Sequence, residues 1–135
     1  MNEKALIDSN ILYYLIDTNE KEKHDKILNW FESIDSNEFV VSNQTLREFA
    51  NISIKKSNLK KEQIIEFLDL FINKFGLIQD NQFDTTKAVQ LSKNKKSFFD
   101  ALIAATMQRN YIDTIITENT KDFVLLGIKT INPLK

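Results

Sequence analysis

Four acidic residues of this sequence have the type and setting to bind a hard cation: Asp8, Glu48, Asp100 and Asp122. Asp8 directly follows the apolar segment 5–7, and Asp100 opens the apolar segment 101–105. Carboxylate oxygens are preferred ligands of Mg²⁺ and Mn²⁺. Carboxylates that share a site repel one another unless a cation lies between them. If these acids meet, the site they form is expected to hold a divalent metal.

Each acid also has a purely structural explanation. Asp is a common helix N-cap, so Asp8 and Asp100 are each placed to cap the helix that follows. Glu48 alone is typical of a solvated helix face, and Asp122 of a turn. An unpaired carboxylate at position 100 would be costly in such apolar surroundings. Taken singly, each acid therefore leaves both explanations open.

Hydrophobic patterning predicts the elements that must position these acids. Strands are expected at 4–7, 38–41, 77–79, 114–117 and 129–131. Helices are expected at 10–16, 23–34, 43–56, 60–75, 84–92 and 99–109. Ser42 or Asn43 is placed to cap the third of these helices, and Gly76 to end the fourth.

Strands separated by helices predict an α/β fold, a three-layer α/β/α sandwich with a mainly parallel central sheet. No repeat or Pro/Gly-rich linker divides the 135 residues, so a single domain over 1–135 is expected. Parallel strands end at one edge of the sheet, where open α/β sheets bind ligands. The acids that follow the strands are therefore expected to face one another.

The composition excludes several classes of protein. A hydrophobic fraction of 42% and ten Phe argue against disorder. The absence of Cys excludes disulfides and thiolate zinc sites, and a single histidine, His24, excludes multi-histidine zinc sites and histidine-pair nucleases. No apolar stretch approaches the ~20 residues of a membrane span, and no apolar signal opens the chain, so a cytoplasmic location without membrane contact is expected.

The formal net charge of −1 leaves nucleic-acid binding to local patches. One lysine-rich segment spans 55–61, and another spans 93–96 next to Asp100. A solvated surface is the plain explanation for both. Arg47, Lys95 and Lys96 are nevertheless candidates for holding substrate phosphates, as point charges that confer little sequence preference.

Four short motifs follow one another over nearly the whole chain. With φ for an apolar residue, residues 6–12 read LIDSNIL, close to φ-D-[ST]-N-φ-L. Residues 41–49 read VSNQTLREF, close to S-x-x-[ST]-x-x-E-φ. Residues 99–105 read FDALIAA, close to D-A-x-I-A-A, and residues 116–123 read ITENTKDF, close to T-x-[DN]-x-x-D-F. In this order the four motifs resemble those of the PIN-domain family of metal-dependent ribonucleases, particularly the VapC-like toxins of toxin–antitoxin operons.

The resemblance implies that Asp8, Glu48 and Asp100 bind one or two Mg²⁺ or Mn²⁺ ions. Asn119 stands where many relatives carry a fourth Asp. Either Asp122 supplies the fourth ligand, directly or through water, or the site operates with three acids. Both arrangements remain open at this point.

The resemblance also implies that Ser9, Asn10 and Thr117 orient the acids, which is physically sensible because ligating carboxylates need fixing. The expected mechanism is metal-ion hydrolysis, in which the metal activates a water and polarises the phosphate while the acids position the metal. RNA as the substrate comes from the resemblance. The residues themselves indicate only a phosphodiester or another anionic ligand.

Other classes of function fit less well. A Rossmann-type nucleotide site needs a glycine loop after the first strand, and residues 8–10 contain no Gly. A phosphotransfer enzyme with Asp8 as nucleophile would usually carry a second acid where Asn10 stands. The main alternative is a non-catalytic PIN-like module that binds RNA or a partner protein, and the presence of all three core acids argues against it.

The resemblance further implies a cognate antitoxin as partner. The predicted helices 23–34 and 60–75 carry wide apolar faces that include Trp30, Phe31, Phe67 and Phe71. Ordinary core packing is the plain explanation for these faces. Some of this surface is nevertheless expected to serve the antitoxin or a homodimer.

Overall fold

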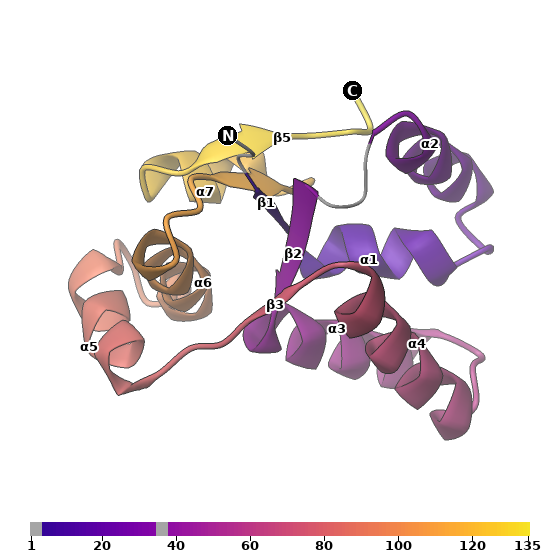
Figure 1. The fold of residues 1–135 in the computed structure, drawn as a ribbon, viewed down its shortest axis with the longest axis horizontal. Helices are drawn as coiled ribbons and strands as arrows, with labels where there is room; N and C mark the ends of the chain where they lie inside the picture. The colour runs from indigo at the N-terminus through magenta and orange to yellow at the C-terminus, as the bar shows by residue number, and fades with distance from the viewer. Residues whose placement is uncertain (1–3, 35–37) are drawn as a thin grey trace.

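The computed structural model describes residues 4–34 and 38–135, which form one five-stranded sheet with every neighbouring pair parallel. The strands are β1 (Ala5–Ile7), β2 (Phe39–Ser42), β3 (Leu77–Ile78), β4 (Thr114–Ile116) and β5 (Lys129–Ile131). Their spatial order is β3-β2-β1-β4-β5. β1 therefore lies at the centre, where Leu6 pairs with Val40 on one side and Ile115 on the other (Figure 1).

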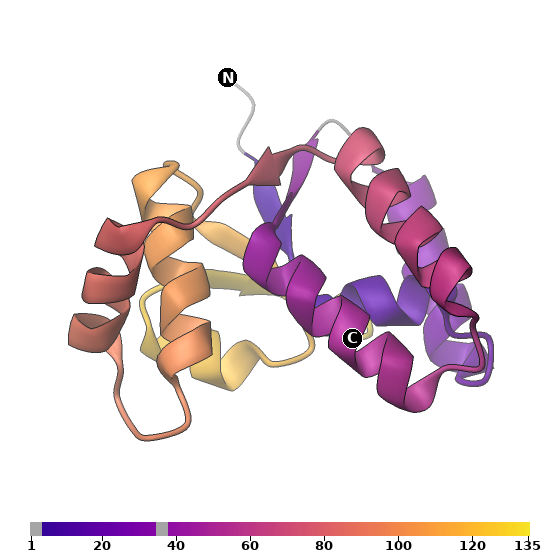
Figure 2. The same cartoon turned by 90° about the horizontal axis from the view of Figure 1, so that it is seen from below.

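Seven α-helices accompany the sheet in the described residues. They are α1 (Ser9–Ile16), α2 (Lys21–Glu32), α3 (Asn43–Lys56), α4 (Lys61–Lys74), α5 (Gln82–Leu91), α6 (Phe98–Arg109) and α7 (Thr120–Leu125). Side chains alternate along a strand, so Ile7 packs in one apolar cluster with α1–α4 and Leu6 in another with α5–α7. The two groups of helices lie on opposite faces of the sheet (Figure 2), which confirms the predicted α/β/α fold.

The predicted strands are all present within one residue of their expected bounds, and the predicted helices within two. Helix α7 was not predicted, because six residues are fewer than two turns and too short to show a helical period. Ser42 is the cap of α3: its Oγ accepts from the Thr45 N–H at 3.0 Å. Helix α4 ends at Lys74 with Phe75 as its C-cap, directly before Gly76, as predicted. Among the described glycines only Gly127 has a positive φ, so Gly76 ends the helix without a left-handed turn.

No helix in residues 4–34 or 38–135 is long and apolar enough to cross a membrane.

An ion pair joins α5 to α6. The Arg109 guanidinium donates to both carboxylate oxygens of Asp84, with Nε–Oδ1 and Nη2–Oδ2 distances of 2.9 Å, and to the Gln79 carbonyl. The Asp84 side chain is only 3% exposed, whereas the Arg109 side chain is 39% exposed. Arg109 therefore supplies the positive charge that makes burial of Asp84 tolerable.

We expect Arg109→Ala to lower the urea midpoint of unfolding clearly, because it leaves the nearly buried Asp84 carboxylate without its cationic partner. Lys21→Ala, which breaks an exposed pair with Asp25 in α2, should cost less than about 0.5 kcal/mol. Urea denaturation measures both changes. Equal, small losses in the two variants would contradict a stabilising role for the Arg109–Asp84 pair.

Candidate active site

The parallel sheet brings the polar segments that follow β1, β2 and β4 to one edge. Asp8 follows β1, helix α3 with Glu48 in its second turn follows β2, and Thr117 follows β4. These three strands are neighbours in the sheet and run in the same direction. Residues far apart in sequence are thereby placed side by side, as the pattern of strands predicted.

Asp8 both caps α1 and lies at the centre of this edge. Its Oδ1 accepts from the Ser9 backbone N–H at 2.8 Å, and its Oδ2 accepts from Thr117 Oγ1 at 2.7 Å. The side chain is buried, and burial raises the pKa of Asp8, although the hydrogen bonds from Thr117 and Ser9 oppose this rise. The structural and functional explanations of Asp8 are therefore compatible.

Glu48 is tied to Asp8 through Ser9. The Ser9 hydroxyl donates to Glu48 Oε1 at 3.2 Å, and Gln44 Nε2 donates to Glu48 Oε2 at 3.3 Å. Burial, and then the charge of Asp8, raise the pKa of Glu48. Gln44 was not among the predicted site residues, although its position one helical turn before Glu48 was a usable signal.

Asp100 is the third residue of α6, and Ser97 occupies the N-cap position, so Asp100 is not the cap. Burial raises the pKa of Asp100 to about 6, with further contributions from the negative charges of Asp8, Glu48 and Asp122. Three other acids therefore act electrostatically on one carboxylate. The four acids from four separate elements share one region of the molecule.

The segment after β4 is held at its backbone. Thr117 Oγ1 accepts from the Asn119 N–H at 2.9 Å, and Asn10 Oδ1 accepts from the Glu118 N–H at 3.4 Å. Asn119 occupies the N-cap position of α7 without a side-chain capping bond. Asp122 lies in the first turn of α7 and is exposed, so its interpretation as a turn residue was wrong.

A second anchor of this segment is not evident from any sequence pattern. Tyr14 donates its hydroxyl to Glu118 Oε1 at 2.6 Å, and Lys23 Nζ lies 3.2 Å from Glu118 Oε2 and 3.1 Å from the Tyr14 hydroxyl. Tyr14 and Lys23 come from α1 and α2, far from Glu118 in the chain. This contact fixes the segment that carries Thr117 and Asn119.

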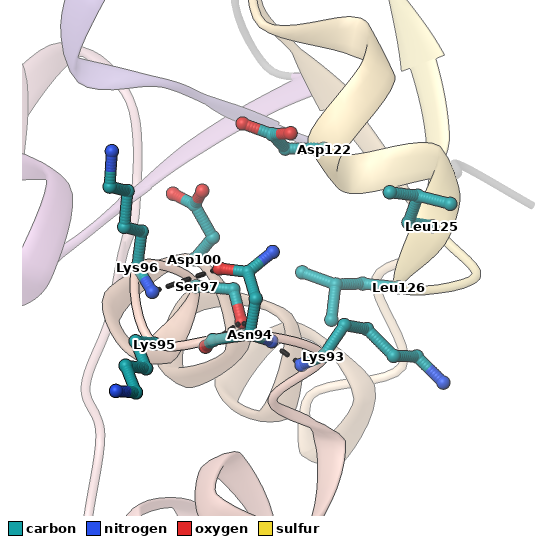
Figure 3. Close-up of a pocket in the computed structure, with 9 residues that line it drawn as sticks. All are labelled: Lys93, Asn94, Lys95, Lys96, Ser97, Asp100, Asp122, Leu125 and Leu126. Atoms are coloured by element: carbon teal, nitrogen blue, oxygen red, sulfur yellow. Dashed lines mark hydrogen bonds between the residues drawn. The ribbon is translucent and has the colours of Figure 1, made fainter.

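A cavity of about 440 Å³ opens beside two of the acids. It is lined by Lys93, Asn94, Lys95, Lys96, Ser97, Asp100, Asp122, Leu125 and Leu126. Figure 3 shows the Lys96 side chain extending to the same side of the loop as the Asp100 carboxylate, whereas Lys95 is directed away from both acids. Arg47 is not among the lining residues; its Nη1 lies 3.4 Å from Asp80 Oδ2 and 3.3 Å from Gln44 Oε1. Lys96 is thus the better placed of the three predicted phosphate contacts.

The donor chemistry of this site fits a hard divalent cation. In the described ranges no three His, Cys, Asp or Glu side chains already stand close enough to hold a metal ion. No ion pair among these same residues neutralises any of the four acids. Carboxylates that share a region repel one another, and a bound cation would offset that repulsion. Asp8, Glu48, Asp100 and Asp122 are the residues that could hold it.

A family model described as the PIN domain matches residues 5–127. The chain belongs to the PIN-domain family. No curated protein sequence matches this PIN domain, but solved structures do.

One similar structure is a toxin–antitoxin complex from Klebsiella pneumoniae, at 26% identity over 96% of this chain and 98% of that chain, with a TM-score of 0.66. FitAcB from Neisseria gonorrhoeae is 19% identical over 96% of this chain and 97% of its own, with a TM-score of 0.71. Mycobacterium tuberculosis VapC20, a sarcin–ricin loop cleaving toxin, is 13% identical over 83% and 87%, with a TM-score of 0.66. The similarity to FitAcB and to VapC20 establishes the fold alone.

We expect Thr117→Val to raise the pKa of Asp8 further, because it removes the hydroxyl that donates to the carboxylate. The loss of one hydrogen bond to a buried acid should also cost about 1–2 kcal/mol of stability. A ¹³C carboxyl NMR titration of Asp8 measures the shift. Thr117→Ser, which keeps the hydroxyl, is the control, and equal titration of the two variants would contradict the role of this hydrogen bond.

We expect Asp100→Asn to stabilise the metal-free protein at pH 7.5 by about 1 kcal/mol, a value reduced for the partial solvation of this side chain. A raised folded-state pKa means that ionised Asp100 disfavours folding. The penalty is absent below about pH 4, grows between about pH 4 and 6, and is complete above that range. The advantage of Asn should therefore vanish toward pH 4.

Urea denaturation in EDTA at several pH values measures this difference. Asp69→Asn, at an exposed acid of α4, is the matched control and should show no comparable gain. A stability gain for Asp100→Asn that is independent of pH would disagree with this electrostatic explanation.

Proposed function

We propose that this PIN domain is a divalent-metal-dependent endoribonuclease that hydrolyses RNA phosphodiester bonds and acts as the toxin of a toxin–antitoxin pair. The observation that carries the proposal is the set of four acids at the carboxyl edge of the sheet, which no cation of the described chain neutralises. Family membership and the relatives described as toxins support it.

Asp8, Glu48 and Asp100 would hold Mg²⁺ or Mn²⁺ in this proposal. The bound metal supplies an acidified water and polarises the phosphate. Ser9 holds Asp8 through its backbone N–H and Glu48 through its hydroxyl. Thr117 fixes the other oxygen of Asp8, so both carboxylates are oriented by neutral donors that do not compete as cations.

The fourth position is better served by Asp122 than by Asn119. The charge of Asp122 contributes to the raised pKa of Asp100, and both carboxylates face the same cavity (Figure 3). Lys96 extends to the same side of the loop as the Asp100 carboxylate and is placed to bind a phosphate oxygen of the RNA. We infer that Asp122 completes the acid set, directly or through water.

We also infer a cognate antitoxin as partner, since several similar structures are toxin–antitoxin complexes. A groove of about 510 Å³ lies between α1, α2 and α4, and its apolar lining includes Leu15, Leu28, Phe31, Phe67 and Leu70. An amphipathic antitoxin helix would pack on such a surface. The homodimer stays a prediction.

The proposal is tested by incubating the purified chain with labelled RNAs and Mg²⁺ or Mn²⁺. We expect cleavage that stops on addition of EDTA. Asp100→Asn and Glu48→Gln should each reduce the rate roughly a hundredfold or more, since even outer-shell changes cost 10–100-fold at metal sites.

Glu66→Gln, which makes the same chemical change on the exposed side of α4, should leave cleavage unchanged. Cleavage that survives both chelation and the two site substitutions would refute the metal–acid mechanism. Tight RNA binding without any cleavage would instead indicate the non-catalytic RNA-binding module.

A further inference from the structure

The cavity beside Asp100 and Asp122 has two chemically different ends. The acids stand at one end with Lys96, whereas Lys93, Asn94, Leu125 and Leu126 form the other end (Figure 3). An anion at the acidic end would be repelled unless a cation lay between them. The end with Lys93 has no such restriction, and the proposed hydrolysis leaves it unused.

The loop that carries Lys93 and Asn94 is fixed by local hydrogen bonds. Ser97 Oγ accepts from the Lys93 N–H at 3.0 Å and from the Asn94 N–H at 3.3 Å, and it donates to the Asn94 carbonyl at 3.0 Å. These bonds hold both residues before any ligand arrives. Preorganisation of this kind reduces the entropic cost of binding.

The orientation of the Asn94 amide follows from one of its partners. Asn94 Oδ1 accepts from the Lys96 backbone N–H at 2.8 Å, so the opposite atom of the amide is the nitrogen, a donor. Figure 3 shows that this nitrogen points into the cavity toward Leu126. Asn94 therefore presents hydrogen-bond donors to whatever occupies this end.

Helix α7 and its last turn supply an apolar wall opposite the loop. Leu126 is 6% exposed, so packing around it holds its side chain in place. Leu125 is 58% exposed and offers most of the accessible apolar surface. A flat ring that packs on these leucines would have its edge beside the Asn94 amide. These three features match the parts of one nucleotide. The positive charge suits its phosphate, the hydrogen-bond donor suits the edge of its base, and the apolar surface suits the face of its base.

We propose that this end of the cavity binds the nucleotide of single-stranded RNA that flanks the scissile phosphate, with Lys93 on its phosphate, Leu125 and Leu126 on its base, and Asn94 donating to the base edge. The inference rests on the proposed ribonuclease function and deepens it. The Asn94 donor can serve the carbonyl oxygens of uracil and the ring nitrogens of adenine alike, so it reads the presence of a base edge and not its identity. Lys93 contacts the phosphate and Asn94 the base edge, so the two residues have separable effects.

The test uses the full chain with Asp100→Asn, which prevents the proposed cleavage, with labelled oligo(U) and an abasic oligoribonucleotide of the same length in Mg²⁺. Fluorescence anisotropy should show tighter binding of oligo(U), because only oligo(U) offers a base to Asn94 and the leucines. Asn94→Ala should weaken binding of oligo(U) roughly three- to tenfold, the effect of one net hydrogen bond, and leave binding of the abasic chain unchanged. Lys93→Ala should weaken binding of both RNAs equally and lower the salt slope of log K by about 0.7.

Two lysine variants separate this site from general charge effects. Lys95→Ala removes a charge from the same loop but from a side chain that lies on the opposite side of the loop from Leu125 and Leu126 (Figure 3), so its loss of affinity should be smaller than that of Lys93→Ala. Lys87→Ala, at an exposed position of α5 outside the cavity, should bind like the parent chain.

Several results would overturn the inference. If the unsubstituted chain cleaves RNA but Asn94→Ala binds oligo(U) as tightly as the parent chain, or Lys93→Ala behaves like Lys87→Ala, the nucleotide site is wrong while the ribonuclease function stands. If the unsubstituted chain neither cleaves nor binds RNA, the proposed function fails, and the nucleotide site fails with it. These two failures are distinguished by the cleavage assay alone.

Discussion

Negative charge buried beside negative charge is the constraint on which the rest of this site depends. Asp8 is almost fully enclosed, Glu48 and Asp100 are partly so, and Asp122 adds its charge to theirs. The raised pKa values of Asp8, Glu48 and Asp100 record the cost of this arrangement. A fold selected for stability alone would have replaced these acids or paired them with Lys or Arg. The described chain instead surrounds Asp8 and Glu48 with neutral donors.

Those neutral donors connect the site to the scaffold. Thr117 links Asp8 to the segment after β4, and Asn10 and Tyr14 hold the same segment through Glu118. Thr117 and Ser9 thereby orient Asp8 and Glu48 without a competing cation at their oxygens, while Asn10 and Tyr14 hold the neighbouring segment. Such supporting contacts set the geometry of carboxylate sites as much as the acids do. Lys93, Lys95 and Lys96 instead line the cavity beside Asp100 and Asp122, where positive charge favours an anionic ligand.

The strands and most helices were predicted correctly because each of them is encoded by the pattern of apolar side chains within its own few residues. Residues 114–116 and 129–131 are recognisable from a few apolar or β-favouring side chains, and 61–74 from a repeated helical spacing. Helix α7 escaped prediction because it has too few turns to repeat a pattern. Gly76 marked the end of α4 correctly, although the backbone there takes no left-handed turn, because glycine permits that turn without requiring it.

The sequence by itself determined the types of the acids, their order and their positions after strands, and a resemblance carried by four short motifs identified the family. Only the tertiary structure decided which donors orient each acid, that Lys95 turns away while Lys96 does not, and that Arg47 contacts Asp80. The reason is physical. Strand order brings residues such as Asp8 and Thr117 together across 109 positions, whereas side-chain direction depends on neighbours that no local pattern encodes.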